Sequence, residues 1–243
     1  MHRPYVLSIA GLDPSGGAGI LADIKTMEAC KVQGFGVASC LTYQNEDSFV
    51  GLNWISPERI IAQIKPLIDF YPIAVIKIGL IEGPETLRII LSFLKKELPN
   101  APIIWDPILR ASAGFDFHQD GMDAFKELLK EIYLITPNWK ELGKGNIDAM
   151  SQAIMLSQFC KVILKGGHSL EERANDYLIV EETIQNFSLP RLQNAAKHGT
   201  GCMFSAAIAS HLALGDSLEE SIRQAKAFVF ERLQSQEGGL ASF

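Results

Sequence analysis

The sequence predicts an α/β protein in which one doubly wound, mainly parallel central sheet carries helices on both faces. Two observations support this fold class. Short apolar runs alternate with amphipathic stretches almost from end to end of the chain. Most of these runs, such as IAVIKIG and KVILK, are apolar on both faces, which is typical of strands that helices cover from two sides. This alternation indicates a single three-layer domain spanning residues 1–243.

Strands are expected wherever a short apolar run is rich in β-branched residues. These runs are Tyr5–Ala10, Phe35–Tyr43, Ile73–Gly79, Pro102–Asp106, Ile132–Thr136 and Lys161–Lys165. Helices are expected between them, and the first has apolar Ile20, Ile24 and Met27 at helical spacing. The expected helices cover Ile20–Lys31, Pro57–Phe70, Pro84–Leu98 and Met122–Glu131.

The pattern changes after Lys165. A β-hairpin is expected over Tyr177–Val180 and Thr183–Leu189, followed by helices over Cys202–Leu214 and Leu218–Gln234. No linker rich in Pro, Gly or Ser separates these segments from the rest, so they belong to the same domain.

The composition restricts the class of protein. Hydrophobic residues make up 47% and charged residues 21% of the chain, which excludes a disordered composition. The net charge of -6 argues against nucleic acid as a partner, because such binding depends on Lys and Arg. No secretory signal and no apolar run of about 18 residues is visible, so neither a membrane span nor export is expected. We expect a cytoplasmic protein.

A glycine-rich loop, Gly11–Gly19, follows the first expected strand. Gly17 stands where a P-loop requires Lys, so that motif is excluded. Residues 17–22 match the loose dinucleotide fingerprint G-x-G-x-x-A, but too many residues separate them from the strand. The loop also carries Asp13 and precedes Asp23. It is either a ligand-binding loop at a strand's carboxyl end or a glycine turn that merely leads into a helix.

A second glycine loop, KHGTGC, opens a later helix. Gly199, Thr200 and Gly201 would expose unpaired backbone N–H groups that could hold an anion, although close packing is the structural alternative. Cys202 falls in the first helical turn, where a helix N-terminus lowers the pKa of a thiol. We therefore expect a thiolate near neutral pH that could accept a proton, with an inert buried cysteine as the alternative.

Polar residues end several of the other expected strands. Asp106, Gln44 and Lys165 each follow an apolar run, and the carboxyl ends of parallel strands form the ligand crevice of an open sheet. Asn138 and Glu141 lie three residues apart at the start of a helix and would suit Mg²⁺. The same pair also fits a capping box, which would be purely structural.

With these two loops and polar strand ends, the chain resembles the hydroxymethylpyrimidine and phosphomethylpyrimidine kinases of the ribokinase-like superfamily. The resemblance extends from residue 5 to about residue 230. The matching motifs occur in order: Ile9–Gly19, Ala22–Lys25, Gln44-Asn45, Lys77–Gly79, Asp106-Pro107, Thr136–Glu141, Lys165–His168 and His198–Cys202.

The resemblance implies a role for each site residue on the substrate side. The pyrimidine should lie near Gly11 and Asp23, with Gln44 hydrogen-bonding its ring and amino edge. Cys202 takes the place of the superfamily's catalytic Asp, and Gly199 to Gly201 form the anion hole. The implied reaction is phosphorylation of hydroxymethylpyrimidine, of its monophosphate, or of both, on the route to thiamin diphosphate.

The resemblance also implies the cofactors ATP and Mg²⁺. Asn138 and Lys165 should approach ATP, while Asp106 and Glu141 should organise Mg²⁺. Similar enzymes are often dimers, so a homodimer is a further implication.

Departures from the family pattern leave the exact substrate open: Leu12 and Leu21 near the first loop, Glu46 after Gln44-Asn45, and Arg110, which could contact the phosphate of a monophosphate substrate. Pyridoxal kinase is the main alternative, because it applies the same chemistry to another hydroxymethyl ring. A sugar kinase fits less well, since those enzymes resemble a GTGD form of the loop. A pyrimidine-binding protein without activity is the alternative of a different class, and it conflicts with the complete set of expected catalytic residues.

Overall fold

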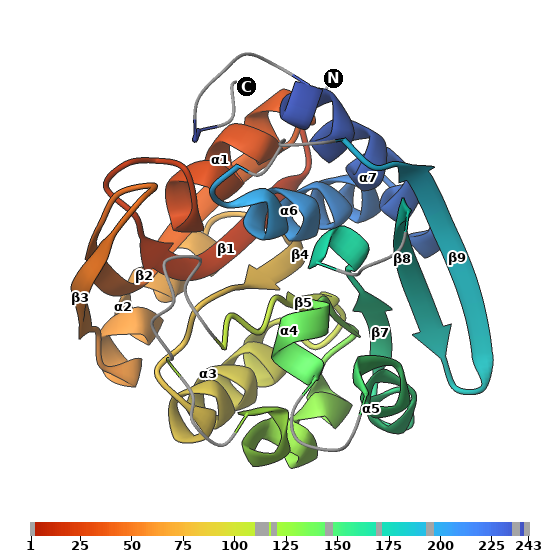
Figure 1. Cartoon of the computed structure of the whole chain (residues 1–243). Coiled ribbons are helices and arrows are strands. Elements are labelled where there is room, and N and C mark those ends of the chain that lie inside the picture. The colour runs from red at the N-terminus through yellow and green to blue at the C-terminus, as the bar shows by residue number, and fades with distance from the viewer. Residues whose placement is uncertain are drawn as a thin grey trace.

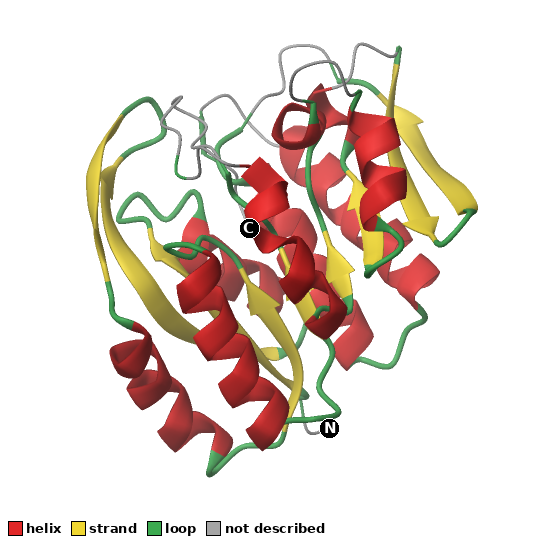
Figure 2. Ribbon diagram, turned by 90° about the horizontal axis from the view of Figure 1, so that it is seen from below, coloured by secondary structure: helices red, strands yellow, loops and turns green. Residues whose placement is uncertain are grey.

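The computed structural model describes residues 3–109, 117, 121–143, 148–168, 172–192, 197–234 and 239–240. Arg110 lies outside these residues. Figure 1 shows one twisted sheet through the middle of the molecule with helices on both sides, and Figure 2 shows the same layers from below. The three-layer α/β architecture predicted from the sequence is confirmed.

The sheet has nine strands among the described residues, in the order β3-β2-β1-β4-β5-β6-β7-β8-β9. Neighbouring strands from β2 to β7 run parallel, whereas β3, β8 and β9 pair antiparallel with their neighbours. The bounds are β1 Tyr5–Leu12, β2 Gln33–Gln44, β3 Phe49–Trp54, β4 Ile73–Ile78, β5 Ile103–Trp105, β6 Leu134–Ile135, β7 Lys161–Leu164, β8 Arg173–Val180 and β9 Thr183–Pro190.

The direction of winding reverses between β1 and β4. The chain first moves outward from β1 to β2 and β3, and then returns to the other side of β1 to place β4. At such a switch point the loops leave neighbouring strands in opposite directions and open a crevice at the carboxyl ends. The fold therefore locates a ligand site beside the end of β1.

The helices form two layers. They are α1 Gly19–Ala29, α2 Pro57–Ile68, α3 Pro84–Glu97, the 3₁₀ helix η1 Gly121–Glu131, α4 Trp139–Leu142, α5 Ala149–Leu156, the 3₁₀ turn η2 Gly166–His168, α6 Thr200–Ala213 and α7 Leu218–Gln234. Buried residues of α1, α6 and α7 share one apolar cluster, and those of α2, α3, α5 and η1 share another.

The central strands contribute to both clusters. In β1, Val6 belongs to one cluster and Leu7 to the other, and in β4 Val75 and Ile76 divide in the same way. Side chains alternate across a strand, so an uninterrupted apolar run buries both faces at once. This explains why runs that were apolar on both faces identified the parallel strands.

Several local expectations were wrong. Phe49–Trp54 forms an edge strand that was not expected, because Gly51 and Asn53 interrupt its apolar residues. The helix Ala149–Leu156 was also missed. The segment expected as an α-helix from Met122 is a 3₁₀ helix.

Among the described residues, no helix has the length and apolar character that a membrane span requires.

We expect Leu7→Ala to lower the free energy of unfolding by about 2–5 kcal/mol, because it removes a fully buried side chain from the central strand. Val50→Ala is the matched control, since Val50 is 81% exposed on β3 and should change stability by less than about 0.5 kcal/mol. Urea unfolding followed by circular dichroism measures both. Equal losses would contradict the assignment of β1 to the core.

Candidate active site

The two glycine loops touch at the starts of α1 and α6. Gly199 has a φ of +78°, and a Cβ placed there would lie 1.9 Å from the carbonyl oxygen of Gly17. Gly19 has a φ of +57°, and a Cβ there would lie 2.1 Å from the carbonyl oxygen of Gly11. Side chains at either position would force the backbones apart. The glycines therefore bring two helix N-termini together at the end of β1.

A hydrogen bond between Asp13 and His198 joins the same two loops. Asp13 Oδ2 lies 2.9 Å from His198 Nε2, and the two side chains are 1% and 7% exposed. Asp13 also accepts hydrogen bonds from the N–H groups of Ser15 and Ala18. Burial alone would raise the pKa of Asp13, but the hydrogen bonds from His198, Ser15 and Ala18 hold it below its usual value. Both residues lie in motifs noted in the sequence, which did not indicate their contact.

Asp23 forms a buried ion pair with Lys77, a lysine whose role the sequence did not indicate. Lys77 Nζ of β4 donates to Asp23 Oδ2 at 2.7 Å, and the Ser8 hydroxyl donates to the same oxygen at 2.6 Å. Both members of the pair are fully buried. The second oxygen, Asp23 Oδ1, is buried with no hydrogen-bond partner among the described residues. Asp23 Oδ1 is thus available to accept a hydrogen bond from a ligand.

Lys77 remains charged in this environment. Burial by itself lowers the pKa of Lys77, but nearby Asp23, Cys202 and Asp106 raise it above its usual value. The lysine therefore supplies a fixed positive charge under the site.

Cys202 lies in the first turn of α6 and is 5% exposed. Burial raises the pKa of its thiol to about 11, although the charge of Lys77 and the N–H of Gly19 both favour the thiolate. The expectation of a thiolate near neutral pH is therefore wrong. Desolvation outweighs the favourable effects of Lys77 and the Gly19 N–H, and the carboxylates of Asp23 and Asp106 raise the pKa further.

Asp106 and Lys165 form the other charged pair of the site. Lys165 Nζ lies 2.7 Å from Asp106 Oδ1, which also accepts a hydrogen bond of 3.0 Å from the Thr136 hydroxyl. Burial raises the pKa of Asp106, but the charges of Lys165 and Lys77 hold that pKa below its usual value. A Cβ at Gly201 would lie 3.1 Å from Lys165 Nζ, so the second glycine loop lies directly against this pair.

Asn138 and Glu141 form the capping box that was the structural alternative. Asn138 Oδ1 accepts hydrogen bonds from the N–H groups of Lys140 and Glu141, and Glu141 Oε2 accepts one of 2.7 Å from the N–H of Asn138. Burial raises the pKa of Glu141 to about 7; Asp106 raises it too, while Lys165 opposes the shift. Glu141 is therefore electrostatically coupled to the Asp106–Lys165 pair.

Gln44 lies at the edge of this arrangement. Its Nε2 donates to the Thr42 hydroxyl at 2.9 Å, and that hydroxyl donates to the carbonyl of Leu12 at 2.9 Å. The Thr42 methyl would be 3.6 Å from a Cβ at Gly11, so Gln44 reaches the first loop through Thr42. The structure thus places the expected site residues at the carboxyl ends of strands, in the glycine loops, or in the helices α1, α4 and α6.

The family model described as "Phosphomethylpyrimidine kinase" matches residues 13–239, which include the second glycine loop, the first from Asp13 onward, and both charged pairs. The chain belongs to this kinase family. It is a phosphotransferase with a ribokinase-like fold.

Curated relatives agree with this assignment. The kinase is 30% identical to a hydroxymethylpyrimidine/phosphomethylpyrimidine kinase of Aquifex aeolicus, with 94% of each chain covered. It is 34% identical to the thiamine biosynthesis bifunctional protein ThiED of Geobacter sulfurreducens over 93% of this chain, but it spans only 48% of that relative.

Solved structures of two kinds resemble this kinase. The phosphomethylpyrimidine kinase of Clostridium difficile is 30% identical, with a TM-score of 0.77 and coverage of 96% of this chain and 100% of that chain. The pyridoxal kinase of Bacillus subtilis, solved as an ADP complex, is 26% identical, with a TM-score of 0.81 and coverage of 95% and 91%.

We expect Gly199→Ala to abolish activity and to lower the free energy of unfolding by more than about 2 kcal/mol, because it adds a steric clash to left-handed strain. Gly215→Ala is the matched control: Gly215 has a φ of +96°, but its Cβ would have no neighbour within 4 Å. That variant should lose about 1 kcal/mol and retain activity. Thermal unfolding and kinase assays measure both, and identical losses would argue against a tight contact between the loops.

Cys202 should show no thiolate below about pH 9, because at that pH a thiol with a pKa of about 11 is ionised to on the order of 1%. The ultraviolet absorbance of thiolates, measured against pH for the wild type and Cys202→Ser, gives the contribution of this residue. In urea, which unfolds the chain, the pKa of the Cys202 thiol should return to about 8.5. A thiolate signal near neutral pH that disappears in Cys202→Ser would contradict the raised pKa of Cys202.

Proposed function

We propose that the chain transfers the γ-phosphoryl group of ATP to the hydroxymethyl group of hydroxymethylpyrimidine, of its monophosphate, or of both in succession. The observation that carries the proposal is the meeting of three groups at the end of β1. The N-terminus of α6 lies against the Asp106–Lys165 pair at Gly201, and Asp23 lies near Cys202 on the other side. Full-length relatives that carry the name of this activity support it.

The substrate side of the proposal comprises Gly11, Asp23 and Gln44. Gly11 lets the end of β1 pack closely against β2, because a Cβ there would lie 2.9 Å from Cys40 Sγ. The free oxygen of Asp23 can accept a hydrogen bond from an amino or hydroxyl group. Gln44 can supply both a donor and an acceptor to the ring edge.

The nucleotide side comprises Lys165 and Asn138, joined by a β-bridge between their segments. Lys165 offers a cation to the phosphates. The unpaired N–H groups of Gly199, Thr200 and Gly201 open α6 and can stabilise the charge that develops during transfer. Phosphoryl transfer depends mainly on such positioning and charge stabilisation. Similar structures, including a Staphylococcus aureus pyridoxal kinase in complex with AMP-PCP and pyridoxal, support the use of ATP.

The residues present also fit Mg²⁺. Among the described residues, no group of three or more acidic, His or Cys side chains is arranged to hold a metal alone. However, Asp106 and Glu141 interact strongly enough for Asp106 to raise the pKa of Glu141, and a cation would relieve this repulsion. Mg²⁺ commonly binds through one or two carboxylates together with substrate phosphates. We propose that these two carboxylates hold it and that it neutralises phosphate charge.

Cys202 acts in its thiol form in this proposal. A thiol with a pKa of about 11 cannot accept a proton near neutral pH before it loses its own. In a loose transition state the attacking hydroxyl needs little help from a base. We therefore assign Cys202 the role of hydrogen-bonding and orienting that hydroxyl.

Pyridoxal is the second candidate substrate. The observation that favours it is the similarity to pyridoxal kinases, which reach TM-scores of 0.81 and 0.83 at 26% and 27% identity. ADP release in the presence of MgATP should be measured with hydroxymethylpyrimidine, its monophosphate and pyridoxal in parallel. Turnover on the pyrimidines with slow turnover on pyridoxal supports the proposal, whereas turnover on pyridoxal alone would replace it.

We expect Cys202→Ala to lower kcat by about 10²-fold or more, since misplacement of the attacking group is costly, and to leave the Kd for AMP-PCP within about twofold. Cys202→Ser should retain more activity, because a hydroxyl can still hydrogen-bond. The pH–rate profiles of the wild type and of Cys202→Ser should have the same inflections, because Cys202 does not ionise near neutral pH. Turnover of Cys202→Ala at the wild-type rate would end this assignment.

A further inference from the structure

A buried ion pair outside the proposed site joins the last helix to the sheet. Lys226 Nζ of α7 lies 2.5 Å from Asp176 Oδ2 of β8, and the two side chains are 10% and 9% exposed. The residues are 50 positions apart in the sequence, so the contact belongs to the tertiary structure. Buried charges are costly unless they are paired and hydrogen-bonded, and neither residue has a part in the proposed reaction.

The second oxygen of Asp176 holds the turn after β7. Asp176 Oδ1 accepts a hydrogen bond of 2.7 Å from the N–H of Gly166. With Lys226 on one oxygen and Gly166 on the other, the carboxylate has a fixed orientation. A Cβ at Gly166 would lie 1.7 Å from the carbonyl oxygen of Asn175, so only glycine allows the turn to approach β8 this closely.

These contacts fix the backbone on both sides of Lys165. The N–H of Lys165 donates to the carbonyl of Pro137 at 2.9 Å, and the next N–H, that of Gly166, donates to Asp176. The two planar peptide units that flank the Lys165 Cα are both held, and together they determine where its side chain points. That side chain reaches Asp106 at 2.7 Å.

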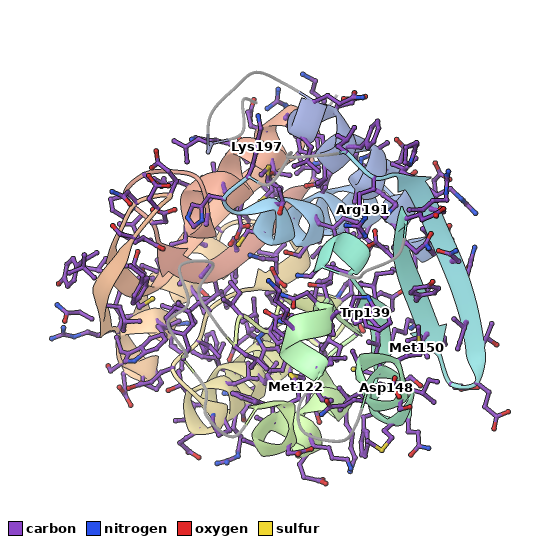
Figure 3. All side chains as sticks on the ribbon, viewed as in Figure 1. Met122, Trp139, Asp148, Met150, Arg191 and Lys197 are labelled. Atoms are coloured by element: carbon purple, nitrogen blue, oxygen red, sulfur yellow. The ribbon has the colours of Figure 1, made fainter. Side chains whose placement is uncertain are left out.

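Arg191 holds the outer side of the same turn. Its Nη1 donates to the carbonyl of Gly167 and its Nη2 to the carbonyl of Gly166, each at 3.0 Å. Figure 3 shows Arg191 next to the turn, between α6 and β8. The turn is thus held by Asp176 and Arg191 in addition to its own backbone contacts.

We propose that Lys226 and Asp176 are positioning residues of the nucleotide site, which act through the Gly166 N–H to direct Lys165 toward the phosphates of ATP. The inference rests on the proposed function, because that function assigns Lys165 to ATP. Loss of either residue weakens nucleotide binding and slows turnover, and it leaves pyrimidine binding unchanged because Asp23 and Gln44 belong to other elements.

The first test is Lys226→Met, which removes the charge and keeps most of the apolar side chain. We expect the Kd for AMP-PCP with Mg²⁺ to rise about tenfold or more, and the KM for the pyrimidine to stay the same. Lys226→Arg should restore most of the nucleotide affinity. Arg223→Met is a control on the same helix, since Arg223 is exposed and its contacts with Glu220 and the Phe187 ring do not involve Asp176, and it should bind AMP-PCP like the wild type.

A second control separates positioning from general loosening of α7. Ile222 is fully buried on the same helix in the apolar cluster, so Ile222→Ala weakens the packing of α7 without removing the ion pair. At a matched loss of thermal stability, it should change nucleotide affinity far less than Lys226→Met. Equal losses in the two variants would overturn the inference.

A double variant keeps the test valid if Lys226→Met does not fold. Lys226→Met with Asp176→Leu removes both buried charges together with the acceptor for the Gly166 N–H, so no unpaired charge remains. We expect it to fold and still to bind AMP-PCP more weakly than the wild type. Wild-type affinity in the double variant would overturn this inference alone, whereas a wild-type chain that binds no AMP-PCP would overturn the proposed function as well.

Discussion

The backbone of Gly199 lies so close to the carbonyl oxygen of Gly17 that no side chain fits between them. This contact brings the starts of α1 and α6 to the same point above the sheet. Each helix leaves unpaired N–H groups at its start, so the region becomes a concentration of donors. A hydrogen bond between Asp13 and His198 reinforces the contact. The candidate anion site exists only because these two loops meet.

Below this contact, charge is balanced by buried pairs and not by solvent. Asp23 is paired with Lys77, and Asp106 is paired with Lys165. Cys202 lies among these groups and remains a neutral thiol, because desolvation outweighs the favourable charge of Lys77. A site of this kind can strengthen the hold on a charged ligand, since the effective dielectric is low. The same low dielectric makes it costly to remove one member of a pair.

The sequence was sufficient to predict features that depend on periodicity and strand order. Strand ends such as Asp106 and Lys165 could be placed together, because carboxyl ends of parallel strands share one edge. The pKa of Cys202 could not be predicted, since local sequence reports the helix terminus but not the depth of burial. The edge strand Phe49–Trp54 was missed because its pattern is broken by Gly51. The partner of Lys226 lies 50 residues away, and no local signal indicates such a contact.

The contact between Asp13 and His198 joins positions 185 residues apart. Most of the chain must therefore be synthesised before the two glycine loops can meet, and the early β–α units must wait for α6 to cover them. Contacts between such distant positions are costly to form in an unfolded chain and tend to form late. A nascent chain that carries only the first glycine loop lacks the donors of the second. Capacity for phosphoryl transfer should thus arise abruptly, near the end of translation, and not accumulate as the domain grows.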